Sequence, residues 1–566
     1  MNLAHKYLEK SEFTSYEDFC NNLKIKIPEN FNFAYDIIDE YARIEPERLA
    51  LVWCNDNGEE RFFSFGELKK WSDKTANFLK QQGIGKGDKV MLILRRRYEF
   101  YFVAFALAKI GAVYIPSTNQ LTEKDIIYRN NAASIKMIIA YNQPDIVQHV
   151  EKSIDKSSTL EKIVLVGVNE NGSSNSYDNH EKWLDFDNCV ESASEQWTRP
   201  IDKKATNNHD LMIIYFTSGT TSMPKMAAHD FTYPLGHIVT AKYWQRVQEG
   251  GLHLTLADSG WAKFGWGKLY GQWICGAVQF VYDMDKFEPC KLLEKMEKYN
   301  LTTFCAPPTV YRFMLQHDLK KYNLSSIKHC STAGEPLNPE VYNRFLSETG
   351  LPIMNGFGQS ETTVMVANFE WLNTQPGSMG KPNPAYDIDV VDQDGNSCPA
   401  GVEGELVVRG VDKNKPAGLF CGYYKDEETT KKVWHDNTYH TGDVVYRDEY
   451  RVLWFIGRVD DVIKASGYRI SPFEVESALI EHPAVVECAV TGAPDRIRGT
   501  VVKATIVLSK GYIPTKELEK EIQGYVKRVT APYKYPRIIE FVDELPKTIS
   551  GKIKRAEIRH EDVEKK

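Results

Sequence analysis

The sequence predicts an α/β protein with a large N-terminal domain of stacked α/β subdomains and a small α+β C-terminal domain. Three observations support this prediction. Short apolar runs that suit buried strands alternate with helical patterns through the N-terminal two-thirds of the chain, which is typical of parallel sheets. After about residue 456 the pattern changes to charged amphipathic helices between short strands. The length of 566 residues also exceeds that of one ordinary domain.

The N-terminal elements follow from apolar runs and the breaks between them. Lys89–Leu94 is an apolar run before a polar break, so we expect a buried strand there. Tyr98–Ile110 follows as a helix that ends at Gly111. Further buried strands are expected at Lys136–Ala140 and Leu211–Phe216. The polar segment Asn169–His180 is expected to form a surface loop.

The C-terminal elements are expected to build a domain of their own. The expected order is a helix at Glu474–Glu481, strands at Val485–Val490 and Lys503–Leu508, and a helix at Lys516–Val529. The charged, glycine-containing stretch Gly457–Asp461 suits a boundary. We therefore expect domains at residues 1–459 and 460–566.

Composition excludes several classes of protein. The 70 basic and 77 acidic residues give a net charge of −7, which offers no general electrostatic footprint for nucleic acid or an anionic membrane. No apolar run approaches the roughly 20 residues of a membrane span, and the first residues lack the apolar stretch of a signal peptide. The ten cysteines are scattered singly, without zinc spacing. Free thiols and a cytoplasmic location are therefore expected.

The first motif is Tyr215–Lys225, YFTSGTTSMPK. A buried strand leads directly into small hydroxyl residues around a glycine, where backbone N–H groups and hydroxyls can close on phosphate oxygens. Lys225 adds a mobile positive charge. The motif is not the Walker pattern. Taken alone, it suits an ordinary Ser/Thr/Gly turn equally well.

Two further motifs combine glycines with a carboxylate. Asn355–Thr362, NGFGQSET, has two glycines that allow close backbone approach to a ligand, and Glu361 could hold magnesium on a triphosphate. In Tyr439–Asp443, YHTGD, the aspartate could accept two hydrogen bonds from a ribose diol. A loop with a structural glutamate and a plain Gly-Asp turn are the alternatives.

The last two motifs are basic. Gly457–Glu476 contains Arg458, which can reach ribose or phosphate. Pro546–Arg555, PKTISGKIKR, has a flexible Gly-Lys tip that suits delivery of a cation to a transferring phosphate. A solvated charged stretch and a basic surface tail are the alternatives for these two motifs.

In this order and at these separations, the five motifs resemble those of the adenylate-forming superfamily of acyl- and aryl-CoA synthetases, luciferases and peptide-synthetase adenylation domains. The resemblance extends from about Phe31 to Arg555. It is greatest to the medium-chain acyl-CoA synthetases, including archaeal members that act on short and branched acids. Asp258–Trp261 looks like the D-[ST]-G-W of that group, and Ile115–Arg129 and Val529–Arg537 look like two of its segments.

The resemblance implies an acid–thiol ligase that uses ATP, Mg²⁺ and CoA. The substrate carboxylate would attack the α-phosphate of ATP to give an acyl-adenylate and pyrophosphate, and the thiol of CoA would then expel AMP. The residues implied in ATP and AMP binding are Thr217, Ser218, Gly219, Thr220, Thr221, Lys225, Gly334, Glu335, Pro336, Asn355, Gly356, Phe357, Gly358, Gln359, Asp443 and Arg458.

Three residues are implied in catalysis by the same resemblance. Ser360 would lie near the acyl carboxylate, and Glu361 would bind the metal. Lys552 would bridge the carboxylate and the α-phosphate during adenylation. Preorganised donors at comparable sites are worth roughly 3–4 kcal/mol.

The C-terminal domain is implied to be mobile and to contribute to the CoA site. The implied CoA positions are Gln120, Ser466, Gly467, Tyr468, Arg469, Arg498 and Lys534. Asp460 matches the hinge about which this domain would rotate between the two half-reactions. Lys552 would then leave the site and the face around Ser466 would replace it.

Two residues depart from the family pattern. Ser222 stands where a glycine is usual, at a cost of ~1 kcal/mol if that position requires φ > 0. Asn355 stands where many relatives have glutamate, so the role of this position is open.

The acyl pocket is implied to include Gly358, Trp266 and Lys263. Acetate-specific relatives have tryptophan where this chain has Gly358, so the pocket need not stop at acetate. Trp266 either refills part of that space or is a core aromatic, and Lys263 is expected to point to solvent. His237 is either a gate or, as we favour, a core or surface histidine.

These implications favour an AMP-forming acyl-CoA synthetase of fatty acid metabolism, acting on a short-to-medium or branched-chain acid. Acetyl- or propionyl-CoA synthetase and a benzoyl-type aryl-CoA synthetase are alternatives. Two other hypotheses are an adenylate-forming enzyme with a carrier-protein acceptor and a non-catalytic acyl-adenylate sensor. A homodimer is left open, and the sequence does not identify the physiological acid or any regulation of Lys552.

Overall fold

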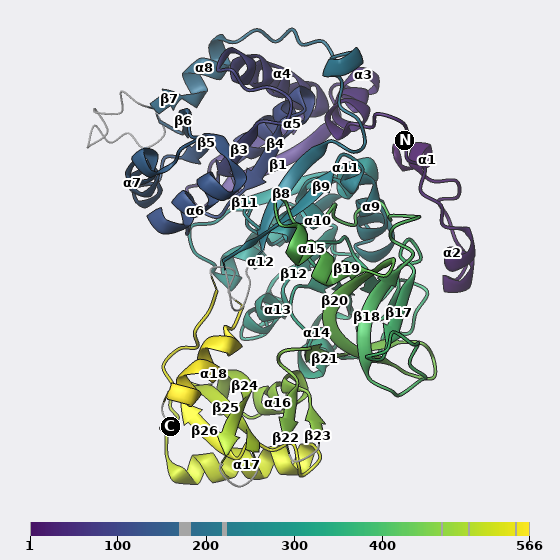
Figure 1. Ribbon diagram of the computed structural model, residues 1–566, viewed down its shortest axis with the longest axis vertical. Coiled ribbons are helices and arrows are strands. Elements are labelled where there is room, and N and C mark those ends of the chain that lie inside the picture. The colour runs from purple at the N-terminus through teal and green to yellow at the C-terminus, as the bar shows by residue number, and fades with distance from the viewer. Residues whose placement is uncertain are drawn as a thin grey trace.

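The computed structural model describes residues 2–168, 183–217, 223–465, 468–495, 499–548 and 552–564. Two large sheets and a smaller antiparallel sheet form the N-terminal part, and a separate α+β unit follows below them (Figure 1). The predicted fold class is confirmed. The expected loop at Asn169–His180 lies outside the described residues.

The first large sheet has seven strands in the order β7-β6-β5-β3-β4-β8-β9. All neighbours are parallel except β8 and β9. The strands are β3 (Lys89–Ile93), β4 (Val113–Pro116), β5 (Ile135–Tyr141), β6 (Lys162–Val166), β7 (Trp183–Asp185), β8 (Leu211–Thr217) and β9 (Lys225–Asp230). The strands predicted at 89–94, 136–140 and 211–216 are thus confirmed as β3, β5 and β8.

Both faces of this sheet are buried. Along β3, Val90 and Leu92 pack into one core cluster, and Met91 and Ile93 pack into another. Helices α4 (Phe65–Gln81), α5 (Glu99–Ile110) and α8 (Phe186–Ser192) cover the first face, and α6 (Glu123–Ala133) and α7 (Pro144–Ser153) cover the second. Burial on both faces explains why these strands are continuous apolar runs.

Helix α5 ends where the sequence predicts. Gly111 adopts φ 81°, ψ 20°, and its N–H bonds to the carbonyls of Leu107 and Ala108. This left-handed conformation is costly for residues with a Cβ, so glycine terminates the helix.

The second large sheet has nine strands in the order β16-β15-β14-β13-β12-β10-β11-β1-β2. Its central strands are parallel, and the strands at both ends are antiparallel. The strands are β1 (Leu49–Asn55), β2 (Glu60–Ser64), β10 (Leu252–Thr255), β11 (Val278–Asp283), β12 (Thr303–Ala306), β13 (His329–Ala333), β14 (Ile353–Phe357), β15 (Val366–Ala367) and β16 (Lys381–Pro382). One face is covered by α12 (Pro289–Lys298), α13 (Pro308–Met314) and α14 (Pro339–Thr349).

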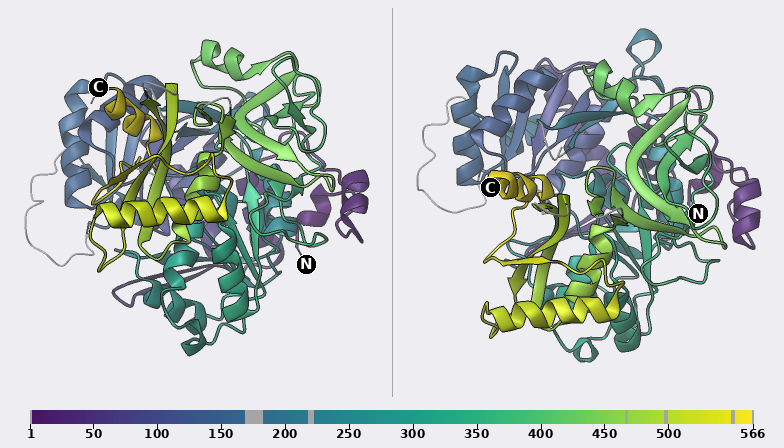
Figure 2. Two further views of the ribbon diagram at one scale, coloured as in Figure 1. Left: turned by 90° about the horizontal axis from the view of Figure 1, so that it is seen from below. Right: turned by 60° about the horizontal axis from the view of Figure 1, so that its bottom comes forward.

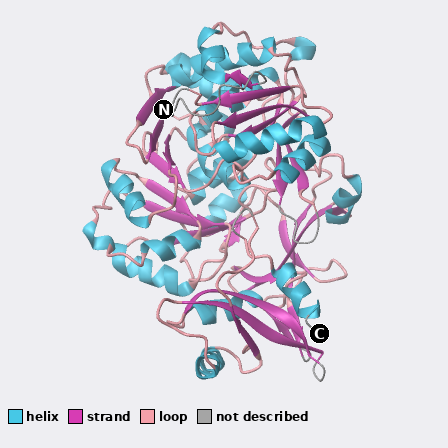
Figure 3. Cartoon of the chain, turned by 90° about the vertical axis from the view of Figure 1, so that its left-hand side faces the viewer, coloured by secondary structure: helices cyan, strands magenta, loops and turns pink. Residues whose placement is uncertain are grey.

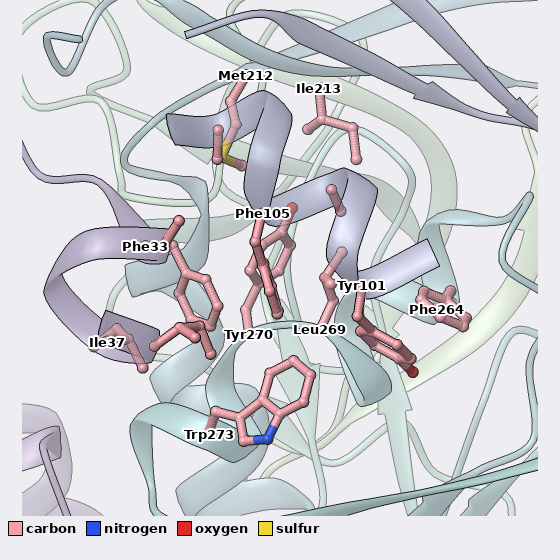
Figure 4. Packing of buried hydrophobic residues seen from close by; sticks show 14 of the residues in the cluster. Phe33, Ile37, Tyr101, Phe105, Met212, Ile213, Phe264, Leu269, Tyr270 and Trp273 are labelled. Carbon is pink, nitrogen blue, oxygen red and sulfur yellow. The ribbon is translucent and has the colours of Figure 1, made fainter. Parts of the chain in front are cut away.

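An aromatic core joins the two large sheets (Figure 4). Tyr101 and Phe105 of α5 each meet Trp273 edge-on, with ring centroids 5.5 Å apart in both pairs. Phe33 packs edge-on against Tyr270 at 5.2 Å. Edge-to-face pairs of this kind are favourable beyond the area that they bury, so the two sheets are held as one unit.

The remaining N-terminal helices are short. They are α1 (Ala4–Tyr7), α2 (Tyr16–Asn22), α3 (Glu40–Ile44), α9 (Tyr233–Val239), α10 (Ala262–Lys268), α11 (Gly271–Ile274) and α15 (Glu427–Val433). Single turns of other helix types are η1 (Ala34–Asp39), η2 (Ile154–Lys156), η3 (Asp202–Lys204), η4 (Thr240–Trp244) and η5 (Leu319–Lys321). Figure 3 shows the strands of the large sheets lying between layers of helices.

A five-stranded antiparallel sheet completes the N-terminal part. Its strands are β17 (Ile388–Val391), β18 (Gly404–Arg409), β19 (Trp434–His435), β20 (Thr438–Arg447) and β21 (Leu453–Arg458). The apolar patterns do not predict this sheet, because β19 has two residues and β20 carries the polar motif HTGD. Gly457 and Arg458 belong to β21, so only the later part of the predicted boundary is a turn.

The C-terminal unit is an α+β domain that lies against the larger part (Figure 2). Its elements are β22 (Ile463–Ala465), β23 (Tyr468–Ile470), α16 (Pro472–Ile480), β24 (Val485–Asp495), β25 (Gly499–Leu508), α17 (Lys516–Val529), β26 (Ile538–Phe541) and α18 (Arg555–Glu564). The helix predicted at Lys516–Val529 is confirmed, and the three other predicted elements are confirmed with shifted or longer bounds.

A buried ion pair anchors the last segment of this domain. Both carboxylate oxygens of Glu476 in α16 accept hydrogen bonds at 2.8 Å from Nη2 of Arg555. Since breaking a buried pair leaves an uncompensated charge, this contact fixes the segment that carries Lys552 three residues earlier.

The ten cysteines are all free thiols, as expected. Within the described ranges, no helix combines the length and apolarity needed to cross a bilayer.

Four histidines are buried in the N-terminal part and have lowered pKa values. Burial lowers the pKa of His229 and His329 to about 4 and that of His253 to about 3. Burial also lowers the pKa of His237 well below its usual value. The folded chain therefore keeps these rings neutral, whereas the unfolded chain protonates them below about pH 6.5.

We predict a steep loss of stability in mild acid. The free energy of unfolding should fall as pH drops below about 6.5, by about 1.4 kcal/mol per pH unit for each buried histidine, until the folded pKa is reached. Urea unfolding of the whole chain between pH 7.5 and 5 measures this slope. His253→Gln should reduce the slope, whereas His209→Gln, at an exposed position, should not. A flat profile above pH 5.5 would contradict the prediction.

Candidate active site

Two sets of the implied nucleotide-binding residues lie where neighbouring parallel strands end. β13 ends at Ala333 and is followed by Gly334–Pro336, and β14 ends at Phe357 and is followed by Gly358–Thr362. The two strands pair in parallel, so both loops emerge at the same sheet edge. Ligands of α/β proteins bind at such an edge. Gly334 has φ 98°, a conformation that side chains other than glycine rarely adopt.

A hydrogen-bond cluster joins the second of these loops to the YHTGD motif on β20. Nε2 of Gln359 donates to Oδ2 of Asp443 at 2.5 Å and to the carbonyl of Thr441 at 2.9 Å. The hydroxyl of Tyr439 donates to Oε1 of Gln359 at 2.5 Å. The amide of Gln359 is therefore used in full by β20, so its role here is to hold Asp443.

Asp443 itself is buried and faces cations. It is the register partner of Arg458 on β21, whose Nη1 lies 3.4 Å from Oδ2. Burial raises the pKa of the Asp443 carboxyl, and Arg458, Gln359 and Lys552 act against that rise. Arg458 remains half-exposed, so part of its guanidinium can reach a ligand.

The charge of Lys552 reaches this cluster from the C-terminal domain. Its backbone closes a turn with Thr548, through bonds of 2.7 Å between Thr548 N–H and the Lys552 carbonyl and 3.1 Å between Lys552 N–H and Oγ1 of Thr548. The side chain is exposed, and its ammonium is close enough to affect the pKa of Asp443. The structure thus places the charge of the fifth motif within electrostatic reach of the third.

Glu361 is buried and held by a segment that sequence reasoning missed. The hydroxyl of Tyr423 donates to Oε1 of Glu361 at 2.8 Å, and Phe420 N–H bonds to the Glu361 carbonyl at 2.8 Å. The ammonium of Lys225 lies 5.1 Å from the centre of the Tyr423 ring. A cation and a carboxylate from two motifs therefore meet around one tyrosine.

The donor set around Glu361 fits a metal held mainly by phosphate. No group of three potential metal-ligating side chains occurs in the parts of the chain that the structure covers. Mg²⁺ is commonly bound by one or two carboxylates together with substrate phosphates, so a single glutamate suits it.

Ser360 is positioned by another residue that the sequence did not indicate. Nε2 of His229 on β9 lies 2.7 Å from the Ser360 carbonyl, which can only accept. With its pKa lowered to about 4 by burial, this imidazole is neutral and donates. His229 and Tyr423 lie outside the recognised motifs, and no spacing in the sequence connects them to residues 360 and 361.

Two indole rings pack against the glycines of the NGFG segment, Gly356 and Gly358. A Cβ on Gly356 would lie 2.4 Å from Cε2 of Trp244, and a Cβ on Gly358 would lie 2.4 Å from Cη2 of Trp266. The two rings meet edge-on, with centroids 6.2 Å apart. The expectation that these glycines serve close approach of a ligand is thus incomplete, because tryptophans occupy the adjacent space.

Lys263 differs from expectation. It lies one turn before Trp266 on α10, and its Nζ donates to the Ala333 carbonyl at 2.6 Å. Burial lowers the pKa of its ammonium. The expectation that Lys263 points to solvent is wrong, because the end of β13 provides an acceptor for it beside Gly334.

His237 occupies a core position. It is fully buried on α9, stacks on Tyr270 with centroids 5.7 Å apart, and meets Oγ1 of Thr240 at 3.2 Å. Asn355 is also buried, and its amide donates to the Ser378 carbonyl at 2.8 Å. Both side chains are therefore engaged within the protein.

The implied CoA residues are partly described. Tyr468 is 50% exposed and stacks on Tyr533 with centroids 4.1 Å apart, beside Lys534, which pairs with Glu474 at 2.5 Å. Gln120 is exposed ahead of α6. Outside the described residues lie Ser218, Gly219, Thr220, Thr221, Ser222, Ser466, Gly467, Arg498 and the side chain of Arg469.

Comparison with known proteins agrees with this arrangement. Residues 38–424 match the model of the AMP-binding enzyme family, and residues 474–552 match that of the AMP-binding enzyme C-terminal domain. The human mitochondrial acyl-coenzyme A synthetase ACSM3 is 42% identical over 559 residues, which cover 97% of this chain and 93% of that protein. Human mitochondrial ACSM4 is 42% identical over 554 residues, covering 96% and 92%.

Solved structures share the fold. An anthranilate CoA ligase, AuaEII, in complex with anthranoyl-AMP has a TM-score of 0.85 at 27% identity, covering 95% of this chain and 98% of that one. A benzoate CoA ligase from Burkholderia xenovorans has a TM-score of 0.79 at 25% identity, covering 94% and 100%.

One expectation is overturned by these comparisons. The relatives at 42% identity are named as mitochondrial proteins, so the expected cytoplasmic location is wrong. The length of the matches and the site geometry agree on the family. The chain belongs to the AMP-binding enzymes and, among them, to the AMP-forming acyl-CoA synthetases.

Proposed function

We propose that this acyl-CoA synthetase activates a short-to-medium or branched-chain carboxylic acid. The activation step rests on the cluster of Gln359, Asp443 and Arg458, with the charge of Lys552 in electrostatic reach, and the choice of acid rests on Trp266 beside Gly358. A buried carboxylate suits a ribose diol, and two cations suit the phosphate next to it. An aromatic acid is the second candidate, supported by similarity to an anthranilate and a benzoate CoA ligase.

In the first half-reaction, the substrate carboxylate attacks the α-phosphate and pyrophosphate leaves. Charge accumulates on the attacking and bridging oxygens, and the Lys552 ammonium is the group proposed to offset it. Arg458 is proposed to orient the ribose and phosphate from the other side, and Ser360 to lie near the acyl carboxylate. Lys225 is proposed to hold the outer phosphates.

Magnesium is proposed to be held by Glu361 together with those phosphates. When bound, the ion would neutralise the leaving pyrophosphate. The hydrogen bond from Tyr423 is proposed to fix the carboxylate of Glu361 in one orientation, as outer-shell partners do at metal sites.

The second half-reaction is proposed to need a rotated C-terminal domain, with domains at 1–459 and 460–566. Asp460 is exposed in the turn between β21 and β22, whereas the adjoining Asp461 pairs with Arg559 at 2.6 Å. An exposed residue, Asp460, next to one held by an ion pair, Asp461, suits a hinge. Tyr468 and Lys534 would then reach CoA, with Gln120 on the other domain. A homodimer stays a prediction.

The proposed chain-length limit is set by Trp266. Its ring abuts Gly358, so the space that a tryptophan at position 358 fills in acetate-specific relatives is partly refilled from α10. For the same reason a Gly358→Trp variant has no room for its new side chain.

The function is tested by a pyrophosphate-release screen over straight, branched and aromatic acids, with and without CoA. We expect CoA-independent adenylate formation and CoA-dependent turnover. Lys552→Ala should lower adenylation by roughly 10²–10³-fold, yet leave CoA attack on supplied acyl-AMP largely intact. Lys554→Ala is the matched control. Equal loss of both half-reactions would contradict the role of Lys552, and no turnover with any acid would favour a sensor.

Tyr423→Phe tests the proposed metal site. Removal of the hydroxyl should raise the Mg²⁺ concentration needed for half-maximal adenylation by about tenfold, because outer-shell losses typically cost 10–100-fold in metal affinity. Tyr424→Phe, next to it in the chain, should leave the Mg²⁺ dependence unchanged. An unaltered dependence in Tyr423→Phe would argue against Glu361 as a ligand.

Asp460→Pro tests the hinge. A proline fixes φ at this position and should slow thioester formation more than adenylation. Measuring the rates of the two half-reactions separately distinguishes an effect on thioester formation from an effect on adenylation. Equal loss of rate in both half-reactions would show that Asp460 is not the hinge.

Trp266→Ala tests the pocket. The vacated indole volume should shift kcat/KM toward longer or bulkier acids by about 10–200-fold, the range expected for small changes in an apolar pocket. Thermal unfolding of the variant provides the control for packing loss. An unchanged chain-length profile in a folded variant would place the limit elsewhere.

A further inference from the structure

The ten cysteines differ sharply in accessibility. Cys54, Cys275, Cys305, Cys330, Cys398 and Cys488 are buried. Cys189 is half-buried, and burial raises the pKa of its thiol. Cys20 and Cys421 are exposed, and Cys290 is half-buried. Cys20, Cys290 and Cys421 are therefore the thiols compared below, because they are accessible at the surface.

Cys290 has an imidazole beside it, outside the site described above. Its Sγ lies 3.3 Å from Nδ1 of His317, which follows α13. Cys290 is the second residue of α12, after Pro289, so it lies in the first helical turn, where backbone N–H groups lack partners within the helix. α12 and α13 pack against each other, which brings the two residues together (Figure 1).

A third titratable group belongs to this cluster. Tyr322 follows η5, and the nearby Cys290 is the main reason for the raised pKa of the Tyr322 hydroxyl. The acidic groups that also act on Tyr322 are Glu294 and Glu297, both on α12. A thiol beside an imidazole in the first turn of a helix has the surroundings of an activated nucleophile.

Neither of the other two accessible thiols has a histidine as its hydrogen-bond partner in the described part of the chain. Cys421 lies 3.3 Å from Oδ2 of Asp230 and 3.3 Å from Nζ of Lys415. Burial, with the charge of Asp230, raises the pKa of the Cys421 thiol to about 11, so it stays protonated. Cys20 is exposed near the middle of α2, where no helix N-terminus favours its thiolate.

We propose that Cys290, with His317 as its base, is a site of reversible S-thiolation by small disulfides of the glutathione type. His317 accepts the thiol proton, and the thiolate of Cys290 attacks one sulfur of the disulfide. A new S–S bond forms, the original S–S bond breaks, and the departing thiolate takes the proton from His317. The disulfide is the oxidant, and one free thiol is released for each adduct.

The location links this thiol to the nucleotide side of the fold. His317 follows the C-terminal end of α13, and Thr309, near the N-terminal end of that helix, donates to Oε2 of Glu335 at 2.7 Å. The proposal rests on the geometry of Cys290 and does not depend on the proposed acid or mechanism.

The experiment uses the full-length reduced protein and glutathione disulfide at pH 7, with the modified cysteines identified by peptide mass spectrometry. Cys290 should be modified at least about tenfold faster than Cys20 and Cys421, although both are more exposed. His317→Gln should reduce the rate at Cys290 to about that of Cys20 and leave Cys20 unchanged. Faster reaction at Cys20 or Cys421 in the unsubstituted protein would overturn the proposal.

A second measurement tests the proposal without the His317→Gln variant, in case that variant fails to fold. The rate of iodoacetamide alkylation at each cysteine is followed against pH in the unsubstituted protein. Alkylation of Cys290 should reach half its maximum at a lower pH than that of Cys20. Coincident profiles would overturn the proposal, and dithiothreitol should remove the glutathione adduct and restore the original mass.

Discussion

The hydrogen bonds of one amide join the two halves of the site. Gln359 follows the end of β14 in the nine-stranded sheet, and it binds Asp443, Thr441 and Tyr439 on the five-stranded sheet. Its carbonyl accepts and its amino group donates, so every part of the amide is used. This contact sets the position of the loop that carries Ser360 and Glu361 relative to the strand that carries Asp443.

The buried carboxylate at this junction needs cations. Burial raises the pKa of Asp443, and two positive groups oppose that effect, Arg458 from the neighbouring strand and Lys552 from the other domain. Arg458 is fixed by strand register, whereas Lys552 is bonded to Thr548 and lies three residues before Arg555, which pairs with Glu476. One charge therefore belongs to the N-terminal part, and the other belongs to the C-terminal domain.

Several elements were predictable because their signals are local. Helix α5 and its terminal Gly111, strand β3 and helix α17 follow from apolar periodicity and helix-end chemistry within a few residues. The antiparallel sheet of β17–β21 was not predictable, because its short strands depend on pairing between segments far apart in the sequence. The partners of Ser360 and Glu361, His229 and Tyr423, depend on the same kind of distant contact.

The sequence by itself determined the family, the order of the five motifs and the identities of the charged groups. These depend on residue types at fixed separations, which the chain preserves whatever its fold. Only the tertiary structure decided that Trp244 and Trp266 fill the space beside Gly356 and Gly358, that Lys263 turns inward to β13, and that Cys290 meets His317. The space open to a side chain and the hydrogen-bond acceptors around it come from residues of separate segments. These segments meet only when the sheets and helices pack.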